Sequence, residues 1–221
     1  MFCEFHGYDY VVDRLDTVRP DRHGNWEKVP HLLRNLTDCD YLFFLDADAV
    51  FYSFAIALHE ELLPRWEPHH LMLFAADCGG EGYRWHPHSV NAGVCLARNT
   101  PETKGILKEW DLASDMPGLE RWRWQWCLEQ RVLMDDVFPK YQHQIKLLQD
   151  YYLMNGLYGQ FVRHYIHVGL GAGTCPLDTD NVSQWRHREL EKLYHSPLME
   201  RNRVLYQSGK SGSRPSPRAG E

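Results

Sequence analysis

Two aspartates one residue apart are the groups in this sequence best placed to do chemistry. Asp46 and Asp48 follow directly on Tyr41–Leu45, an apolar run whose length predicts a strand buried on both faces. In open α/β sheets, ligands bind at the carboxyl ends of the strands. Burying both carboxylates alone would be costly, and a divalent cation removes that cost, because Mg²⁺ and Mn²⁺ prefer oxygen ligands. The pair therefore predicts a metal site. The alternative is an exposed turn with two solvated acids.

Two classes of enzyme carry such a pair after a buried strand. In sugar-nucleotide transferases the acids hold a metal against the diphosphate. In phosphohydrolases of the haloacid-dehalogenase type, the first aspartate of an Asp-x-Asp-x-(Thr/Val) motif is the nucleophile, and Asp46–Val50 fits that pattern too. However, the phosphohydrolase motif normally follows the first strand, and here a predicted strand at Tyr8–Val12 and a helix come earlier. The candidates for its second acid pair, Asp135 and Asp136, fall within or just after a predicted helix.

Alternating strands and helices must position these groups. The patterns predict a three-layer α/β domain with a mostly parallel sheet over residues 1–206, followed by a disordered tail rich in Ser, Gly, Pro and Arg at 207–221. The expected strands are 8–12, 41–45, 71–75, 90–97, 145–148 and 165–168. The expected helices are 26–37, 55–63, 101–113, 120–134 and 185–194, the third capped by Thr100.

Four blocks of the sequence together resemble glycosyltransferase family 34, which includes plant xyloglucan xylosyltransferases and fungal galactomannan galactosyltransferases. Their order and spacing agree with the family over about residues 2–169. The blocks are a Cys-x-x-His-Gly helix end in Phe2–Tyr8, a Trp-x-Lys-x-Pro helix start in Trp26–Pro30, the apolar strand with Asp-x-Asp in Leu42–Ala49, and an Asn-x-Gly strand ending in Arg-Asn in Asn91–Asn99.

The resemblance implies a GT-A-type fold and a metal-dependent, retaining transfer of galactose, xylose or mannose from a nucleotide-diphosphate donor. The expected cofactors are Mn²⁺ or Mg²⁺ and a UDP-sugar, and the expected acceptor is a glycan or glycoprotein. A metal suits this chemistry because negative charge grows on the departing diphosphate. By the same resemblance, Asp48 would bind the metal, and Asp46 would contact the metal or the sugar and ribose of the donor. His167 would be the third ligand, with His164 as the alternative.

Three further residues are implied on the donor side. Lys28 and Arg98 are candidates to offset phosphate or carboxylate charge, and Asn91 is a candidate contact to the donor. For each cation, a solvated or structural role is the alternative.

The helix predicted at 120–134 carries the candidates for catalysis. Glu129 and Gln130 resemble the family's acid–glutamine block, although Leu128 stands at one acidic position. Gln130 would then lie beside the anomeric carbon, and Glu129 would contact donor or acceptor hydroxyls. Trp122, Trp126 and Gln130 would share one helical face. Such an aromatic stripe is either a sugar platform or part of the core.

Composition excludes several other classes of function. With 24 basic and 30 acidic side chains, the formal charge of −6 argues against nucleic-acid binding by bulk electrostatics. A hydrophobic content of 43% excludes a mainly disordered chain. No apolar run approaches the roughly 18–20 residues that span a bilayer, and the six cysteines form no Cys-x-x-Cys motif. The family resemblance alone points to the Golgi membrane or lumen.

The chain begins in the helix that follows the family's first, nucleotide-binding strand. The resemblance therefore implies a transferase lacking this strand and exposing an apolar sheet edge. An inactive remnant of a transferase is then an alternative, beside the phosphohydrolase.

Overall fold

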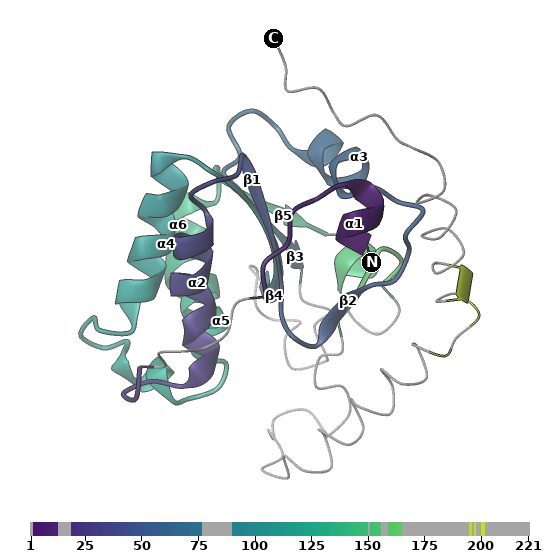
Figure 1. The fold of residues 1–221 in the computed structure, drawn as a ribbon. Coiled ribbons are helices and arrows are strands. Elements are labelled where there is room, and N and C mark those ends of the chain that lie inside the picture. Colours follow the sequence, from purple (N-terminus) through teal and green to yellow (C-terminus); the bar gives the residue numbers. More distant parts are fainter. Residues whose placement is uncertain are drawn as a thin grey trace.

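A four-stranded mixed sheet forms the centre of the molecule, with the order β1–β4–β3–β5 (Figure 1). The computed structural model describes residues 2–12, 19–76, 90–149, 151–155 and 159–164, and in addition 195, 197 and 200–201. The strands of this sheet are β1 (Tyr41–Leu45), β3 (Met72–Ala76), β4 (Val90–Arg98) and β5 (Ile145–Leu148), and a separate two-stranded sheet pairs β2 (Ala49–Phe51) with β6 (Val162–His164).

Three of the four central strands point in the same direction. β3 and β5 are parallel, whereas β4 lies between β1 and β3 and is antiparallel to both. The α/β architecture expected from the sequence is confirmed, with β4 as the strand that makes the sheet mixed. The pairing of β3 with β4 shifts register between Phe74 and Ala75, an irregularity opposite Asn91–Cys95.

Helices cover both faces of the sheet, one group on each side in Figure 1. Side chains alternate between the two cores, so that Met72 and Phe74 join one and Leu73 and Ala75 the other. The helices over the first core are α2 (Lys28–Asn35), α4 (Pro101–Ala113), α5 (Leu128–Val132) and α6 (Phe138–Tyr141), with the 3-10 turns Gly24–Glu27 and Glu120–Arg123 and a π-helical turn at Leu133–Val137. Over the second lie α1 (Phe2–His6), α3 (Leu58–Leu62) and α7 (Tyr151–Met154), with a 3-10 turn at Leu63–Arg65.

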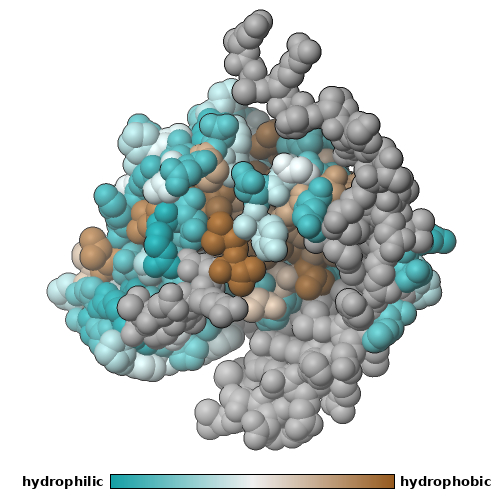
Figure 2. Space-filling model, in the orientation of Figure 1, coloured by the Kyte–Doolittle hydropathy of each residue, from teal (hydrophilic) through white to brown (hydrophobic). Residues whose placement is uncertain are grey.

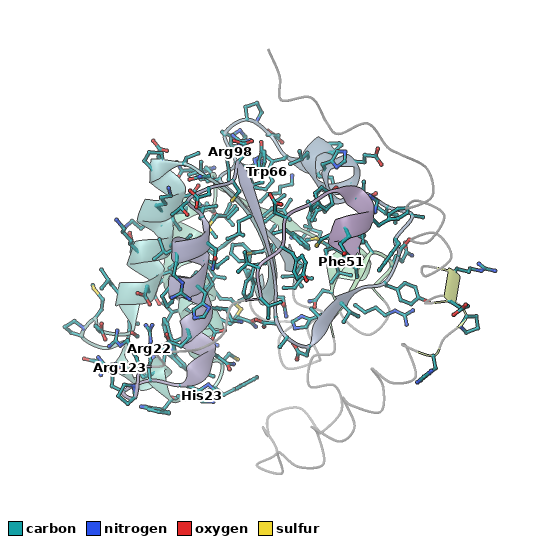
Figure 3. All side chains as sticks on the ribbon, viewed as in Figure 1. Arg22, His23, Phe51, Trp66, Arg98 and Arg123 are labelled. Carbon is teal, nitrogen blue, oxygen red and sulfur yellow. The ribbon has the colours of Figure 1, made fainter. Side chains whose placement is uncertain are left out.

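Specific contacts fix the elements that carry the site. The Thr100 hydroxyl accepts a hydrogen bond from the Thr103 N–H (3.1 Å) and caps α4 as the sequence predicts. Phe51 of β2, labelled in Figure 3, stacks on Phe2 of α1 with ring centroids 3.7 Å apart. This stacking joins the small sheet to the second core.

A buried ion pair holds the start of α2 against α4. The Arg22 guanidinium lies 3.2 Å from Glu27 and 2.7 Å from Asp111, and the Arg22 side chain is 1% exposed. Lys28 is the first residue of α2, so these contacts also set its position.

Three predicted elements differ from the structure. Tyr8–Val12 forms no strand, and its residues Tyr10, Val11 and Val12 are exposed. The helix predicted at 55–63 is limited to Leu58–Leu62, and the one predicted at 120–134 is divided. The strand predicted at 165–168, the helix at 185–194 and the tail at 207–221 lie outside the described residues.

β1 lies at one edge of the central sheet. Tyr41 is exposed and the next four residues of the strand are half-buried. Figure 2 shows apolar residues gathered at the centre of this face, between α2 and α1, where Figure 1 draws β1. Within the described residues, no helix is long and apolar enough to cross a bilayer.

Candidate active site and metal centre

Asp46, Asp48 and His164 come together where β1 ends. The Asp46 N–H donates to the Gly93 carbonyl (2.8 Å), and the Ala49 N–H donates to the Asp46 carbonyl (2.9 Å), which forms a tight turn. Ala49 then pairs with His164 across β2 and β6. As a result, one ligand atom from each of the three side chains lies within 4.8 Å of the others.

The hydrogen bonds around His164 favour a cation at this point. The Asn155 amide nitrogen donates to the Ala76 carbonyl (3.1 Å), so the Asn155 oxygen faces His164 Nδ1 at 3.1 Å and accepts its proton. With the ring proton on Nδ1, the Nε2 lone pair of His164 faces Asp48 Oδ1 at 3.1 Å and Asp46 Oδ2 at 4.0 Å. Facing acceptors repel unless a proton or metal lies between them. Two carboxylates and an imidazole suit Mn²⁺ or Mg²⁺.

Gly93 leaves the space that this cluster occupies. A Cβ at this position would lie 2.1 Å from His164 Cε1 and 2.7 Å from Asp46 Oδ2. The side-chain oxygen of buried Asn91 accepts from the Gly93 N–H (2.9 Å) and holds this part of β4. Asn91 therefore lies beside the site, as a residue that shapes it.

Lys28 joins the metal candidates to a buried acid. Its Nζ lies 3.0 Å from Asp46 Oδ2 and 2.9 Å from Glu129 Oε1, and the other Glu129 oxygen is buried with no hydrogen-bond partner among the described residues. Burial raises the pKa of Glu129, and the Lys28 ammonium opposes that rise. Burial alone would lower the pKa of Lys28, but the carboxylates of Glu129 and Asp46 outweigh it and raise the pKa, so Lys28 stays charged.

The charges of the site match one divalent cation. The carboxylates of Asp46, Asp48 and Glu129 and the ammonium of Lys28 together carry a net charge of −2. The residues present therefore fit a divalent metal ion.

α5 places Glu129 and Gln130 beside β4. The Gln130 side-chain oxygen accepts from the Ala92 N–H (2.9 Å), so its amide nitrogen is the donor end of the side chain. The Glu129 carbonyl accepts from the indole N–H of Trp110 (2.9 Å), which anchors α5 to α4. Six of the residues named from the sequence thus lie together: Lys28, Asp46, Asp48, Asn91, Glu129 and Gln130.

Arg98, a candidate for donor binding, lies away from the two aspartates. It pairs with Tyr41 at the start of β1, about 17 Å along the strand from Asp46. Its guanidinium donates to the Pro68 carbonyl (2.7 Å) and lies 5.4 Å from the Trp66 ring centroid. An open groove of about 520 Å³ is lined there by Tyr41, Leu63, Trp66, Pro68 and Arg98. Figure 3 shows Arg98 and Trp66 at the end of the molecule away from Arg22 and His23.

The predicted tryptophan stripe does not form. Trp122 is buried, whereas Trp124 and Trp126 are 61% and 51% exposed. His167 lies outside the described residues, and the histidine in the cluster is His164, the alternative that the sequence offered. Asn155, which orients His164, carries no motif by which the sequence would have revealed it.

The whole-chain comparisons add evidence on the fold. No protein-family model and no curated protein matches the sequence. Among solved structures, a glycosyltransferase involved in glycosylation of the major capsid of PBCV-1 is similar with a TM-score of 0.58 and 14% identity over 86% of this chain and 87% of that one. The glycosyltransferase GlyE of Streptococcus pneumoniae TIGR4 has a TM-score of 0.51 and 16% identity over 90% of this chain, which spans 48% of GlyE. Together with the sheet and the Asp-x-Asp turn, these likenesses give the chain the GT-A-type fold of glycosyltransferases.

Proposed function

We propose that this protein transfers a sugar from a nucleoside-diphosphate donor to a hydroxyl group of a glycan, with Mn²⁺ or Mg²⁺ held by Asp46, Asp48 and His164. The observation that carries the proposal is the cluster of these three side chains at the carboxyl end of β1. The net charge of −2 around it calls for a divalent cation, which the diphosphate of a donor would share. The fold likeness to two glycosyltransferases supports the same conclusion.

Each residue around the metal candidates has a distinct part in this proposal. The bound metal would offset the negative charge that develops on the leaving diphosphate. Lys28 holds the Asp46 carboxylate in place through its 3.0 Å contact. Glu129, whose carboxylate lies 2.9 Å from Lys28 Nζ, is our candidate for a contact to donor or acceptor hydroxyls.

Retention of the anomeric configuration is part of the proposal. A retaining enzyme needs a nucleophile or a group that stabilises the oxocarbenium-like sugar on the face opposite the one from which the diphosphate leaves and at which the acceptor arrives. The carboxamide of Gln130, oriented by its bond to the Ala92 N–H, is our candidate for that group. The four sequence blocks shared with family 34 support a UDP-sugar carrying galactose, xylose or mannose.

The phosphohydrolase alternative lacks its second acid pair in the described residues. Asp135 and Asp136 lie in the π-helical turn Leu133–Val137, and Asp135 pairs with Arg131. Neither follows a strand that ends beside Asp46. We therefore favour the transferase.

Calorimetric titration of UDP with and without Mn²⁺ tests the proposal. We expect UDP binding to require Mn²⁺ and to weaken at least about a hundredfold in Asp48→Asn. Losing a residue that only supports a metal ligand costs up to about a hundredfold in metal affinity, and losing a ligand itself should cost at least as much. Asp38→Asn is the matched control, because Asp38 is an exposed acid just before the other end of β1.

The outcomes separate the candidate functions. Equal UDP binding by Asp48→Asn and by the unchanged protein, or binding indifferent to Mn²⁺, would sink the proposal. Metal-dependent binding without hydrolysis of any UDP-sugar would identify the inactive remnant. Release of phosphate from phosphomonoesters, blocked in Asp46→Asn, would favour the phosphohydrolase.

A further inference from the structure

Two tryptophans in the described part of the chain lie in solvent. Trp124 is 61% and Trp126 is 51% exposed, although tryptophan is a residue that folded proteins bury on average. Trp26, Trp110 and Trp122 show the ordinary behaviour, because each is less than 10% exposed. Two large exposed apolar rings so close in sequence indicate a surface that binds something.

The two rings belong to the loop at residues 124–127, which backbone hydrogen bonds hold in place. The loop is held by the Gln125 and Leu128 N–H groups, which donate to the Arg121 carbonyl (2.9 Å) and the Gln125 carbonyl (2.8 Å). Leu128 has a positive φ of 58°, which is uncommon for a non-glycine residue and persists where surrounding contacts enforce it. Leu128 is buried, so the turn directs its side chain inward while Trp126 stays outside.

The loop is joined to the two segments that carry Glu129 and Lys28. Trp126 is three residues before Glu129, so their Cα atoms are at most about 11 Å apart. The Trp124 ring meets the edge of His23 at 6.3 Å between centroids, and the His23 N–H donates to the Arg123 carbonyl (2.8 Å). His23 precedes the turn that leads into α2 and Lys28. Figure 3 shows His23 and Arg123 side by side at this end of the molecule.

Arg123, which adjoins the loop, is already paired with an acid. Arg123 donates to the Ser114 carbonyl (2.7 Å) and to Asp115 (2.9 Å), so its cation is already paired. A flat indole with a polar N–H suits a pyranose ring, whose C–H groups form an apolar face and whose hydroxyls lie at its rim. A charged ligand would find no matching charge at Arg123.

We infer that Trp124 and Trp126 form a platform on which an uncharged pyranose ring of the acceptor stacks, with its hydroxyl directed toward the Glu129 side of the site. The inference rests on the proposed transferase function and adds to it the class of acceptor. The metal and donor residues hold the UDP-sugar, and the two indoles hold the second substrate.

The test follows the indole N–H signals of the ¹⁵N-labelled protein with Mg²⁺ and UDP bound. Trp124→Phe and Trp126→Phe identify the two signals. Methyl β-glucoside, methyl β-galactoside, methyl β-xyloside and methyl α-mannoside are added in turn, and sorbitol, a polyol without a ring, is the control. We expect at least one glycoside to move both signals saturably at millimolar concentration, while the signal of buried Trp110 stays in place.

A double variant, Trp124→Ala with Trp126→Ala, measures the contribution of the platform. We expect binding of that glycoside to weaken about tenfold for each tryptophan removed, while UDP binding is unchanged. Tyr41→Ala is the matched control, because it removes an exposed aromatic ring at the far end of β1.

The readouts keep the two proposals apart. If no glycoside moves the two signals, or sorbitol moves them equally, the platform is overturned, whatever UDP does. If the glycosides bind but UDP binding does not depend on the metal, the transferase is refuted and the acceptor assignment is overturned with it. Glycoside binding by the double variant at unchanged affinity would also overturn the inference.

Discussion

Gly93 shapes the site through the side chain that it lacks. We expect Gly93→Ala to abolish Mn²⁺-dependent UDP binding, because the new Cβ would lie 2.1 Å from His164 Cε1 and push the imidazole away from the two aspartates. The overpacking should also destabilise the fold by about 1–3 kcal/mol. Calorimetry and urea denaturation measure the two effects.

The control for this change is Gly105→Ala in α4. A Cβ at Gly105 would have no neighbour within 4 Å, and alanine in an exposed helix position gains about 0.5–1 kcal/mol over glycine. This variant should be more stable and bind UDP normally. If Gly93→Ala bound UDP as well as Gly105→Ala does, the cluster of Asp46, Asp48 and His164 would not be the metal site.

At the residue scale, the sequence predicted the acids better than the cations. Asp46 and Asp48 could be placed because an apolar strand before them left few environments for two carboxylates. Arg98 lies at the far end of β1 because β4 is antiparallel to β1, and the sequence did not reveal the direction of that strand. The proximity of Lys28 and Glu129 could not be predicted, since it depends on how α2 and α5 pack together.

A hydrogen bond from an indole N–H joins α5, which carries Glu129, to α4. Trp110 of α4 donates to the Glu129 carbonyl, and its ring is fully buried. We expect Trp110→Phe to cost about 1–3 kcal/mol, because the Glu129 carbonyl loses its partner in the core. Since α5 then loses an anchor, sugar transfer should slow while UDP affinity stays near normal.

Trp66→Phe provides the comparison for that variant. Trp66 donates an equivalent bond to the His70 carbonyl (2.7 Å), at the end of the sheet away from the site. Denaturation should show a similar loss of stability, and UDP-release kinetics should show no slowing of transfer. Equal slowing in both variants would mean that transfer responds to stability alone and that the anchor has no special part.

At the element scale, the wrong predictions share a cause. Trp122, Trp124 and Trp126 alternate, which is a period of two, and the segment proves to be a 3-10 turn and a loop instead of a helix. Tyr8–Val12 has β-forming residues and pairs with no strand in the described residues. By contrast, α4 was predictable at its start, because the Thr100 cap and Pro101 are local signals. Pairing and packing are tertiary properties, so propensity alone could not supply them.

At the scale of the whole molecule, the alternation of strands and helices along the chain predicted the α/β architecture. It did not predict the direction of β4 in the sheet. The apolar runs 41–45 and 71–75 indicated buried strands, but β4 runs between them in the opposite direction. β4 is nine residues long and pairs with β1 along one side and with β3 along the other. The site therefore lies where one long antiparallel strand, through Asn91–Gly93, passes the end of β1.

The rate at which Cys95 of β4 reacts with a thiol reagent measures how often the central sheet opens. It is fully buried, and burial raises the pKa of its thiol to about 12, so a thiol reagent should reach it only after the sheet opens. Cys39, which is partly exposed, should react much faster in the folded protein. Because UDP and Mn²⁺ bind the folded state, raising them to about a hundred times their Kd should slow Cys95 labelling about a hundredfold, and Asp48→Asn should remove that protection. Mass spectrometry of the labelled peptides measures both rates. If Cys95 reacted as fast as Cys39, β4 would open locally, and the site that rests on Gly93 would lack the rigid support that we assign to it.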